Sequence, residues 1–135
     1  MPEPGHMQIG EVAERTGLSL RTIRYYGEVG LVEPSARSRG GFRLYTEADV
    51  GRLNLIKRMK PLEFSLEETR ELLEALDRLS SVETSPEERK TLSERLDVFE
   101  AAITARCEAL REQLAMAEEF AGRLREQRAR GNVIA

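Results

Sequence analysis

Arginine and tyrosine side chains crowd one short stretch of the sequence, the letters "RTIRYY" of residues 21–26. A packed core has no use for Arg21 and Arg24, whose guanidinium groups supply paired hydrogen-bond donors. Tyr25 and Tyr26 are neighbours and cannot share one face of a helix, so we expect Tyr25 to point outward and Tyr26 to be partly in the core. The stretch therefore predicts a surface that contacts something outside the protein.

Two short helices are expected to position these side chains. Apolar residues at helical spacing predict a first helix over residues 9–15, and Gly17 can adopt the left-handed conformation that ends it. Ser19 is a good N-cap for a second helix over residues 20–28. Two helices joined by such a turn outline a helix-turn-helix, in which the start of the second helix meets base edges of DNA. Residues 21, 22, 24 and 25 lie in that part.

The next segment, residues 32–44, is not helical, because Pro34 and the Gly40-Gly41 pair interrupt it. Short β-capable pieces flank a polar tip and predict a small hairpin, or wing. Basic and aromatic side chains alternate along it, which suits a phosphate backbone. We expect the wing to contact DNA through Arg37, Arg39, Phe42, Arg43 and Tyr45.

Three further helices are expected after the wing. Thr46, with Asp49 at the third helical position, predicts a helix with an apolar face and a basic side, which Pro61 ends. Residues 65–68, "SLEE", are a capping box for the next helix. Residues 85–88, "SPEE", combine an N-cap, an initial proline and a glutamate, and predict the start of a long helix.

Apolar residues along the long helix recur at steps of three and four, which is a heptad seam with one extra step of four. A helix of about 40 residues spans about 60 Å, so it cannot bury this stripe on a small N-terminal domain. A partner helix is needed, most simply from a second copy of the chain. The predicted dimerisation residues are Leu92, Leu96, Phe99, Ile103, Cys107, Leu110, Leu114, Ala117, Ala121 and Leu124.

The composition excludes most enzyme classes. The chain has one cysteine and one histidine, and the histidine, His6, lies in the predicted leader. Without His6 the chain has no imidazole to activate a nucleophile, and no Cys/His cluster for zinc. We therefore expect no enzyme, no metal and no cofactor, and a packing role for Cys107. The net charge of −3 hides a split, because residues 1–60 carry a net +3 and residues 61–135 a net −6. No segment is apolar enough to span a membrane, and no signal peptide is present, so a cytoplasmic protein is expected.

The ordered motifs "TIRYY", "GLVEP", "GGFRLYTEADVGRL" and "FSLEETRELL" strongly resemble the MerR family of bacterial transcription regulators. The resemblance covers residues 8–79 and implies a mainly α fold, namely a winged helix-turn-helix followed by an antiparallel coiled-coil dimer helix. It implies that a homodimer binds a pseudo-palindromic promoter and distorts its spacer, with RNA polymerase affected indirectly. It also carries the DNA-contact role to Arg21, Thr22, Arg24, Tyr25, the wing residues or their support, and Lys60.

The expected organisation is a leader or tag remnant at 1–7, the DNA-binding domain at 8–79, a connector at 80–85, the dimerisation helix at 86–130 and a tail at 131–135. Phe42 departs from the tyrosine usual in the family, and Glu63 stands where the family usually has glycine, so a positive φ there would carry strain. Two other functions stay open: an architectural or recombination-accessory DNA-binding protein, and a coiled-coil adaptor. The sequence does not say whether a small-molecule effector exists.

Overall fold

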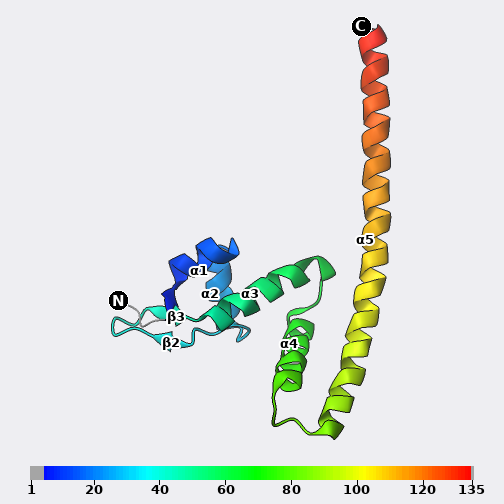
Figure 1. Cartoon of the computed structure of the whole chain (residues 1–135). Helices are drawn as coiled ribbons and strands as arrows, with labels where there is room; N and C mark the ends of the chain where they lie inside the picture. Colours follow the sequence, from blue (N-terminus) through cyan, green and yellow to red (C-terminus); the bar gives the residue numbers. More distant parts are fainter. Residues whose placement is uncertain (1–4, 135) are drawn as a thin grey trace. The chain divides into compact units, whose positions relative to one another are not determined.

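The computed structural model describes residues 5–134, with side chains through residue 131 (Figure 1). The predicted leader residues 1–4 and the last tail residue, 135, lie outside the described part. The chain forms two compact units, residues 1–71 and 72–135. The elements are β1 (Met7–Gln8), α1 (Ile9–Thr16), α2 (Leu20–Glu28), β2 (Ala36–Arg37), β3 (Arg43–Tyr45), α3 (Glu47–Met59), the 3-10 turn η1 (Lys60–Leu62), α4 (Leu66–Ser80) and α5 (Pro86–Ile134). The mainly helical class and the long C-terminal helix are thus confirmed.

The helices of the first unit begin and end where side chains can satisfy their backbone groups. Gly17 has φ 73° and its N–H donates to Ala13, so it ends α1 in the left-handed conformation. Ser19 caps α2 by accepting the Thr22 N–H at 3.0 Å. Thr46 and Asp49 form a capping box at the start of α3. These local interactions fix the turn between α1 and α2, and they confirm the predicted caps.

A three-stranded antiparallel sheet of order β1-β3-β2 forms the base of the wing. Leu44 of β3 pairs with Gln8 on one side and with Ala36 on the other. Met7 is buried in this sheet, which therefore begins one residue inside the segment predicted to be a leader. The leader prediction is wrong for Met7, because Met7 pairs with Tyr45 in the sheet. The local sequence did not indicate this pairing, since Tyr45 lies far away along the chain.

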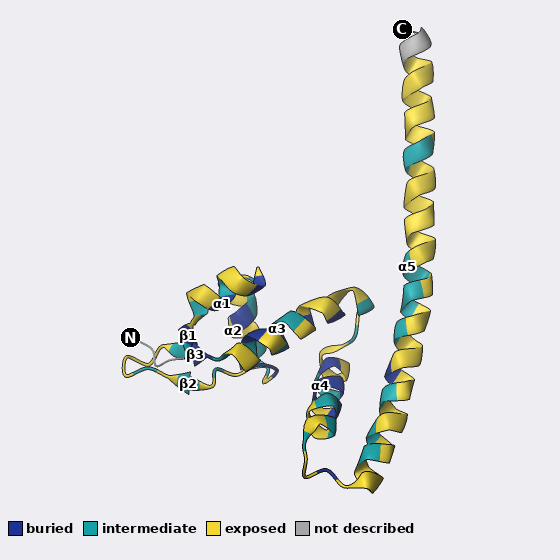
Figure 2. Ribbon diagram, viewed as in Figure 1, coloured by how far each residue is buried: buried dark blue, intermediate teal, exposed yellow. Residues whose placement is uncertain are grey.

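The core of the first unit collects apolar side chains from each of its layers. Val12 of α1, Ile23 of α2 and Leu53 of α3 are fully buried, and Tyr45 of β3 is buried among the same elements. Arg15 also joins α1 to α3 through two 2.6 Å contacts with the Glu47 carboxylate. Helix α1 therefore packs against both α2 and α3, and Figure 2 shows buried segments in these helices.

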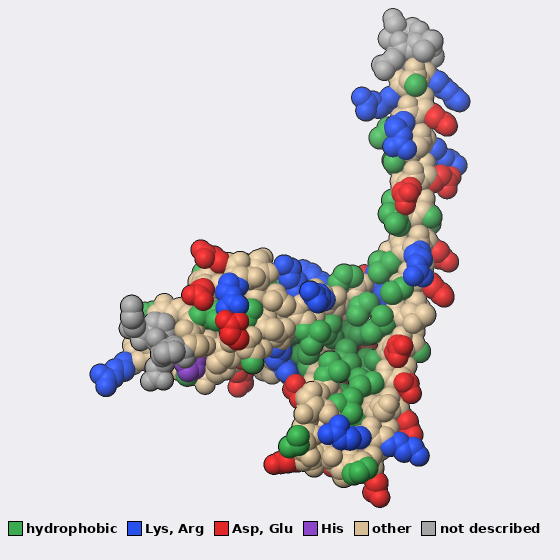
Figure 3. Space-filling model, in the orientation of Figure 1, with side chains coloured by type: hydrophobic (Ala, Val, Ile, Leu, Met, Phe, Trp, Pro, Cys, Tyr) green, Lys and Arg blue, Asp and Glu red, His purple; other side chains and the backbone are tan. Residues whose placement is uncertain are grey.

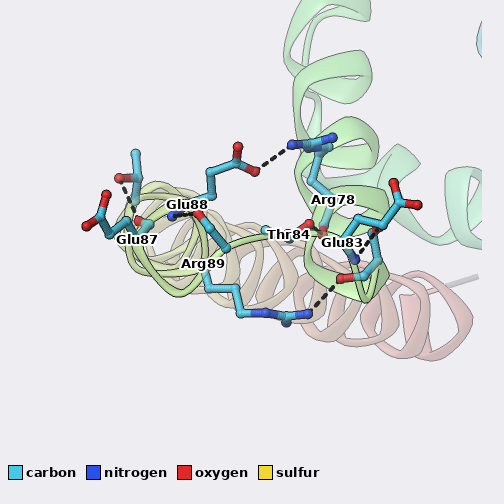
Figure 4. Close-up of polar contacts among 9 residues, drawn as sticks. Arg78, Glu83, Thr84, Glu87, Glu88 and Arg89 are labelled. Carbon is cyan, nitrogen blue, oxygen red and sulfur yellow. Dashed lines mark hydrogen bonds and ion pairs between the residues drawn. The ribbon is translucent and has the colours of Figure 1, made fainter.

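The second unit contains most of α4 and all of α5. Polar contacts join the end of α4 to the beginning of α5 (Figure 4). Arg78 pairs with Glu88 at 2.5 Å, and Arg89 donates to the carbonyl of Leu79 at 2.8 Å. Thr84, which is buried in the connector, donates to the Arg78 carbonyl. These bonds satisfy carbonyls at the end of α4 that have no partner within that helix.

Helix α5 runs without a break to Ile134. The prediction of an irregular tail from residue 131 is therefore wrong for residues 131–134. The favourable start at Ser85 and Pro86 and the absence of an interior proline allow this length, and the two late glycines do not interrupt it. Among the described residues, no helix is long and apolar enough to cross a membrane.

Candidate nucleic-acid interface

Helix α2 has one outer face and one inner face. Arg21, Arg24 and Tyr25 are exposed, and Tyr25 keeps 48% of its surface accessible. Ile23 is fully buried on the opposite face, and Tyr26 is half-buried beside it. The orientations predicted for the two tyrosines agree with this arrangement, and the three outer side chains share a face at helical spacing.

The inner face fixes the direction in which the outer side chains point. Burial raises the pKa of Tyr26, in keeping with a phenol that is partly withdrawn from water. The ring centroids of Tyr25 and Tyr26 lie 6.0 Å apart with a 50° angle between their planes. Thr22 is half-buried, and its hydroxyl accepts a hydrogen bond from Ser19 at 2.9 Å, so it also takes part in the cap.

The wing tip is a tight turn from Ser38 to Phe42. The Ser38 N–H donates to the Phe42 carbonyl, and Gly41 donates back to Ser38, each at 2.9 Å. Gly41 has φ 81°, a backbone conformation that residues other than glycine rarely adopt. Arg37 donates to the Gly41 carbonyl at 3.0 Å. The predicted hairpin is present, and its tip holds Arg39 exposed in solvent.

A cleft of about 120 Å³ lies between α2 and the wing. Arg24 enters it from α2, while Phe42 and Arg43 enter it from the wing. Phe42 is 62% exposed, so its ring forms an open apolar wall beside two cations. Two guanidinium groups next to a flat apolar surface could contact a phosphate and the sugar attached to it.

The structure places Tyr45 in the core, with none of its surface accessible. Of the two roles predicted for it, wing contact or support, burial leaves only support, so it is no surface contact. Tyr45 pairs with Met7 of β1, which is itself buried, so this end of β3 lies in the core. Burial raises the pKa of Tyr45, and the charge of Arg43 opposes that rise.

Lys60 lies apart from this cleft. It is exposed in η1, directly after α3, and lines a second cleft of about 220 Å³ together with Tyr26 and Phe64. The structure thus brings together Arg24, Phe42 and Arg43, whereas Lys60 and the tip residue Arg39 occupy separate positions around the first unit.

Two residues that line the cleft were not predicted from the sequence to contact DNA. Gln8 lines it from β1, and Ile9 lines it from the start of α1. Their position depends on the pairing of β1 with β3, a contact between segments more than 30 residues apart. The only signal available in the sequence was the position of Ile9 at the start of the first predicted helix.

The apolar stripe of α5 is only partly covered within one chain. Phe99 is 8% exposed, so it departs from the prediction that it is available to a partner. The next residues of the stripe are half-buried up to Leu110, and Leu114 and Leu124 are 59% and 52% exposed. Hydrophobic side chains alternate with charged ones along this later part of α5 (Figure 3). Cys107 is half-buried within the stripe.

Comparisons with known proteins agree on one family. Residues 7–76 match the MerR HTH family regulatory proteins, and residues 50–117 match the MerR DNA-binding family. The mercuric resistance operon regulatory protein of Bacillus cereus is 44% identical over 71 residues, which are 53% of this chain and 54% of that protein. The regulator ZntR of Escherichia coli K12 is 48% identical over 66 residues, 49% of this chain and 47% of that protein. The chain thus spans about half the length of these relatives.

Solved structures support the same assignment over more of the chain. A MerR-family transcriptional regulator from Bacillus cereus is 30% identical, with a TM-score of 0.59, covering 88% of this chain and 75% of that one. HiNmlR, described as a MerR family regulator lacking the sensor domain and bound to promoter DNA, is 25% identical, with a TM-score of 0.62, covering 85% and 77%. These relatives are regulators rather than enzymes. The chain belongs to the MerR family of helix-turn-helix regulatory proteins.

Proposed function

We propose that the chain is a homodimeric transcription regulator that binds a pseudo-palindromic promoter sequence-specifically and distorts the spacer of that promoter. The observation that carries this proposal is the outer face of α2, where Arg21, Arg24 and Tyr25 are exposed while Ile23 and Tyr26 hold the helix on the core. In a helix-turn-helix, this face of the second helix contacts base edges. Arg21, Thr22, Arg24 and Tyr25 are the proposed contacts of α2.

The wing supplies the proposed contacts to the DNA backbone. Phe42 and Arg43 line the cleft beside Arg24, Arg39 lies at the wing tip, and Arg37 at the end of β2 donates to the Gly41 carbonyl of the tip. Phosphate contacts fix the position of a protein on DNA, whereas base contacts specify the sequence. Lys60 is proposed to contact a phosphate on another side of the unit.

The partly covered stripe of α5 supports a dimer. Fully burying one leucine contributes ~1.5–3 kcal/mol, so each half-exposed leucine of the stripe gains a share of this when a partner covers it. Because the stripe follows a heptad pattern, a second copy of α5 can cover it. The antiparallel orientation and the distortion of the promoter come from the resemblance, as does an indirect effect on RNA polymerase.

A selection of bound genomic fragments by the purified protein tests the proposal directly. We expect an inverted repeat inside an over-long promoter spacer. Arrays of sites outside promoters would instead favour an architectural role. If no sequence is enriched and a protein partner is recovered, the adaptor function replaces the proposed one.

Variants of α2 make the test specific. Arg24→Ala should weaken binding to the selected site by ~1–3 kcal/mol for each half-site if the side chain reads a base. Arg111→Ala, which removes an exposed arginine from α5, is the matched control with the same change in net charge. The logarithm of the affinity should also fall steeply with the logarithm of the salt concentration, because several lysine and arginine side chains replace counterions on DNA. Equal affinities for Arg24→Ala and Arg111→Ala would refute the proposed contact.

A further inference from the structure

Basic side chains from α3 and α4 reach the backbone at the end of the recognition helix α2. The Arg70 guanidinium donates to the carbonyl of Val29, the C-cap of α2. Arg52 of α3 donates to the carbonyl of Leu31 at 2.9 Å. Both arginines are half-buried, and neither belongs to the proposed DNA-contact surface.

These two bonds satisfy groups that the local sequence leaves without donors. Residues 29–32 turn away from α2 while their own N–H groups donate back to Tyr25, Tyr26 and Gly27. The last turn of α2 contains no basic residue, although a cation is favourable at the negative end of a helix dipole. The cations that α2 lacks are therefore supplied from elsewhere in the fold.

Arg70 differs from Arg52 in the element that carries it. Arg52 lies within α3, which belongs entirely to the first unit. Arg70 lies in α4, which begins at Leu66 in the first unit and continues into the second. Arg70 thus connects the end of the recognition helix to the helix that leads into the dimerisation unit.

The other contact of Arg70 is weak by comparison. Its second guanidinium nitrogen lies 3.5 Å from Glu67, whose side chain is 81% exposed. Exposed ion pairs of this kind contribute little to the stability of the fold. The bond to the Val29 carbonyl is half-buried and charge-assisted, so it is the contact that constrains geometry.

We propose that Arg70 is a positioning residue, which couples the placement of α4 to the pose of the recognition helix. When α4 is in place, Arg70 fixes the end of α2 and so directs Arg21, Arg24 and Tyr25 at the bases. The coupling rests on the proposed function, because its readout is specific binding to DNA. It ties the first turns of α4 to the helix that reads the sequence.

The test compares three variants of the full-length protein. Arg70→Met keeps most of the apolar stem and removes every donor, while Arg70→Lys keeps the charge and one donating group. Arg78→Met is the matched control, since Arg78 also lies on α4 but pairs with Glu88 in the second unit. Each variant is measured for affinity toward the selected site and toward random DNA, for amide hydrogen exchange at Leu31 and Val32, and for stability.

We expect Arg70→Met to lower affinity for the selected site by roughly tenfold, because a hydrogen bond to a charged group is lost. Its affinity for random DNA should stay within about twofold, since phosphate contacts dominate that binding. Exchange at Leu31 and Val32 should accelerate, and Arg70→Lys should recover part of both effects. Arg78→Met should change neither.

An unchanged ratio of selected-site to random-DNA affinity in Arg70→Met would overturn the coupling. A purely structural role would produce that result, because it lowers stability and both affinities together. If the unmodified protein prefers no DNA sequence, the proposed function itself fails, and the exchange data then report only a local bond. The two failures are therefore distinguishable.

Discussion

Glu63 carries a backbone conformation that suits glycine better than glutamate. It follows η1 with φ 58° and ψ 32°, and it is the one residue other than glycine with a positive φ among residues 5–134. Its N–H donates to the Lys60 carbonyl at 3.2 Å, which closes the turn between α3 and α4. Its side chain is exposed, and replacement by glycine removes the cost of holding this backbone conformation.

The size of the effect follows from two opposing contributions. The left-handed conformation costs an L-residue ~1–2 kcal/mol, which glycine does not incur. Glycine in turn gives the unfolded chain more freedom, which lowers stability by ~0.4–1 kcal/mol. Glu63→Gly should therefore raise the free energy of unfolding of the first unit by about 0.5–1 kcal/mol.

Glu33→Gly is a matched control in the same unit. Glu33 is also exposed and outside helices and strands, but its φ is not positive. Both substitutions remove one negative charge, so the change in net charge is the same in the two variants. Glu33→Gly should lower stability by ~0.4–1 kcal/mol, and the two variants should thus differ by ~1–2 kcal/mol.

Urea unfolding followed by tyrosine fluorescence measures this difference cleanly. The protein has three tyrosines and no tryptophan, and all three tyrosines lie in the first unit. The signal therefore reports the unit that contains Glu63. If Glu63→Gly destabilises this unit as much as Glu33→Gly does, the strain assigned to Glu63 is not present.

Three further predictions concern the caps, the core and the dimer. The backbone N–H of the N-cap, Ser65, lowers the pKa of Glu68 from its ordinary value, so the charged form of Glu68 stabilises the fold above the ordinary pKa of a glutamate. The advantage of the unmodified protein over Glu68→Gln should shrink as the pH falls from about 5 to 3, as measured by thermal unfolding. The Tyr45 hydroxyl is buried without a hydrogen-bond partner among the described residues, so Tyr45→Phe should leave stability equal or higher and DNA affinity unchanged. The helix orientation can be tested in a variant that lacks Cys107. If the dimer is antiparallel, Leu92→Cys and Leu124→Cys together should form intermolecular disulfides on oxidation, whereas either substitution alone should not. Cross-linking of a single variant to itself would indicate parallel helices.

Local sequence determined the helices of this protein closely. Ser19 and the Thr46–Asp49 pair satisfy the first N–H groups of their helices within three residues, so the same contacts form wherever the chain turns helical. Gly17 marks the end of α1 for the equally local reason that it tolerates a positive φ. The positive φ of Glu63 was expected only through the resemblance to a family with glycine there, because no local pattern requires it.

Contacts between distant segments could not be predicted in the same way. The two-residue strand β1 has no pattern of its own and exists because β3 offers it a free edge. Arg70 reaches Val29 across 41 positions of the sequence, and nothing in either segment indicates the other. For the same reason, Tyr45 was grouped with the wing contacts, although its pairing directs it into the core.

The two units differ in whether one chain can bury its own apolar surface. The first unit closes its core, with Val12, Ile23 and Leu53 wholly buried. Helix α5 has 49 residues, about 74 Å, and among the described residues of its stripe past Leu110, Leu114, Ala117 and Leu124 are exposed. Most helices derive their stability from packing an apolar face, and a stripe at heptad spacing specifies a partner of the same kind. The heptad pattern and the exposure of Leu114 and Leu124 therefore lead to the same proposal, in which a second copy of α5 completes the core that one chain leaves open.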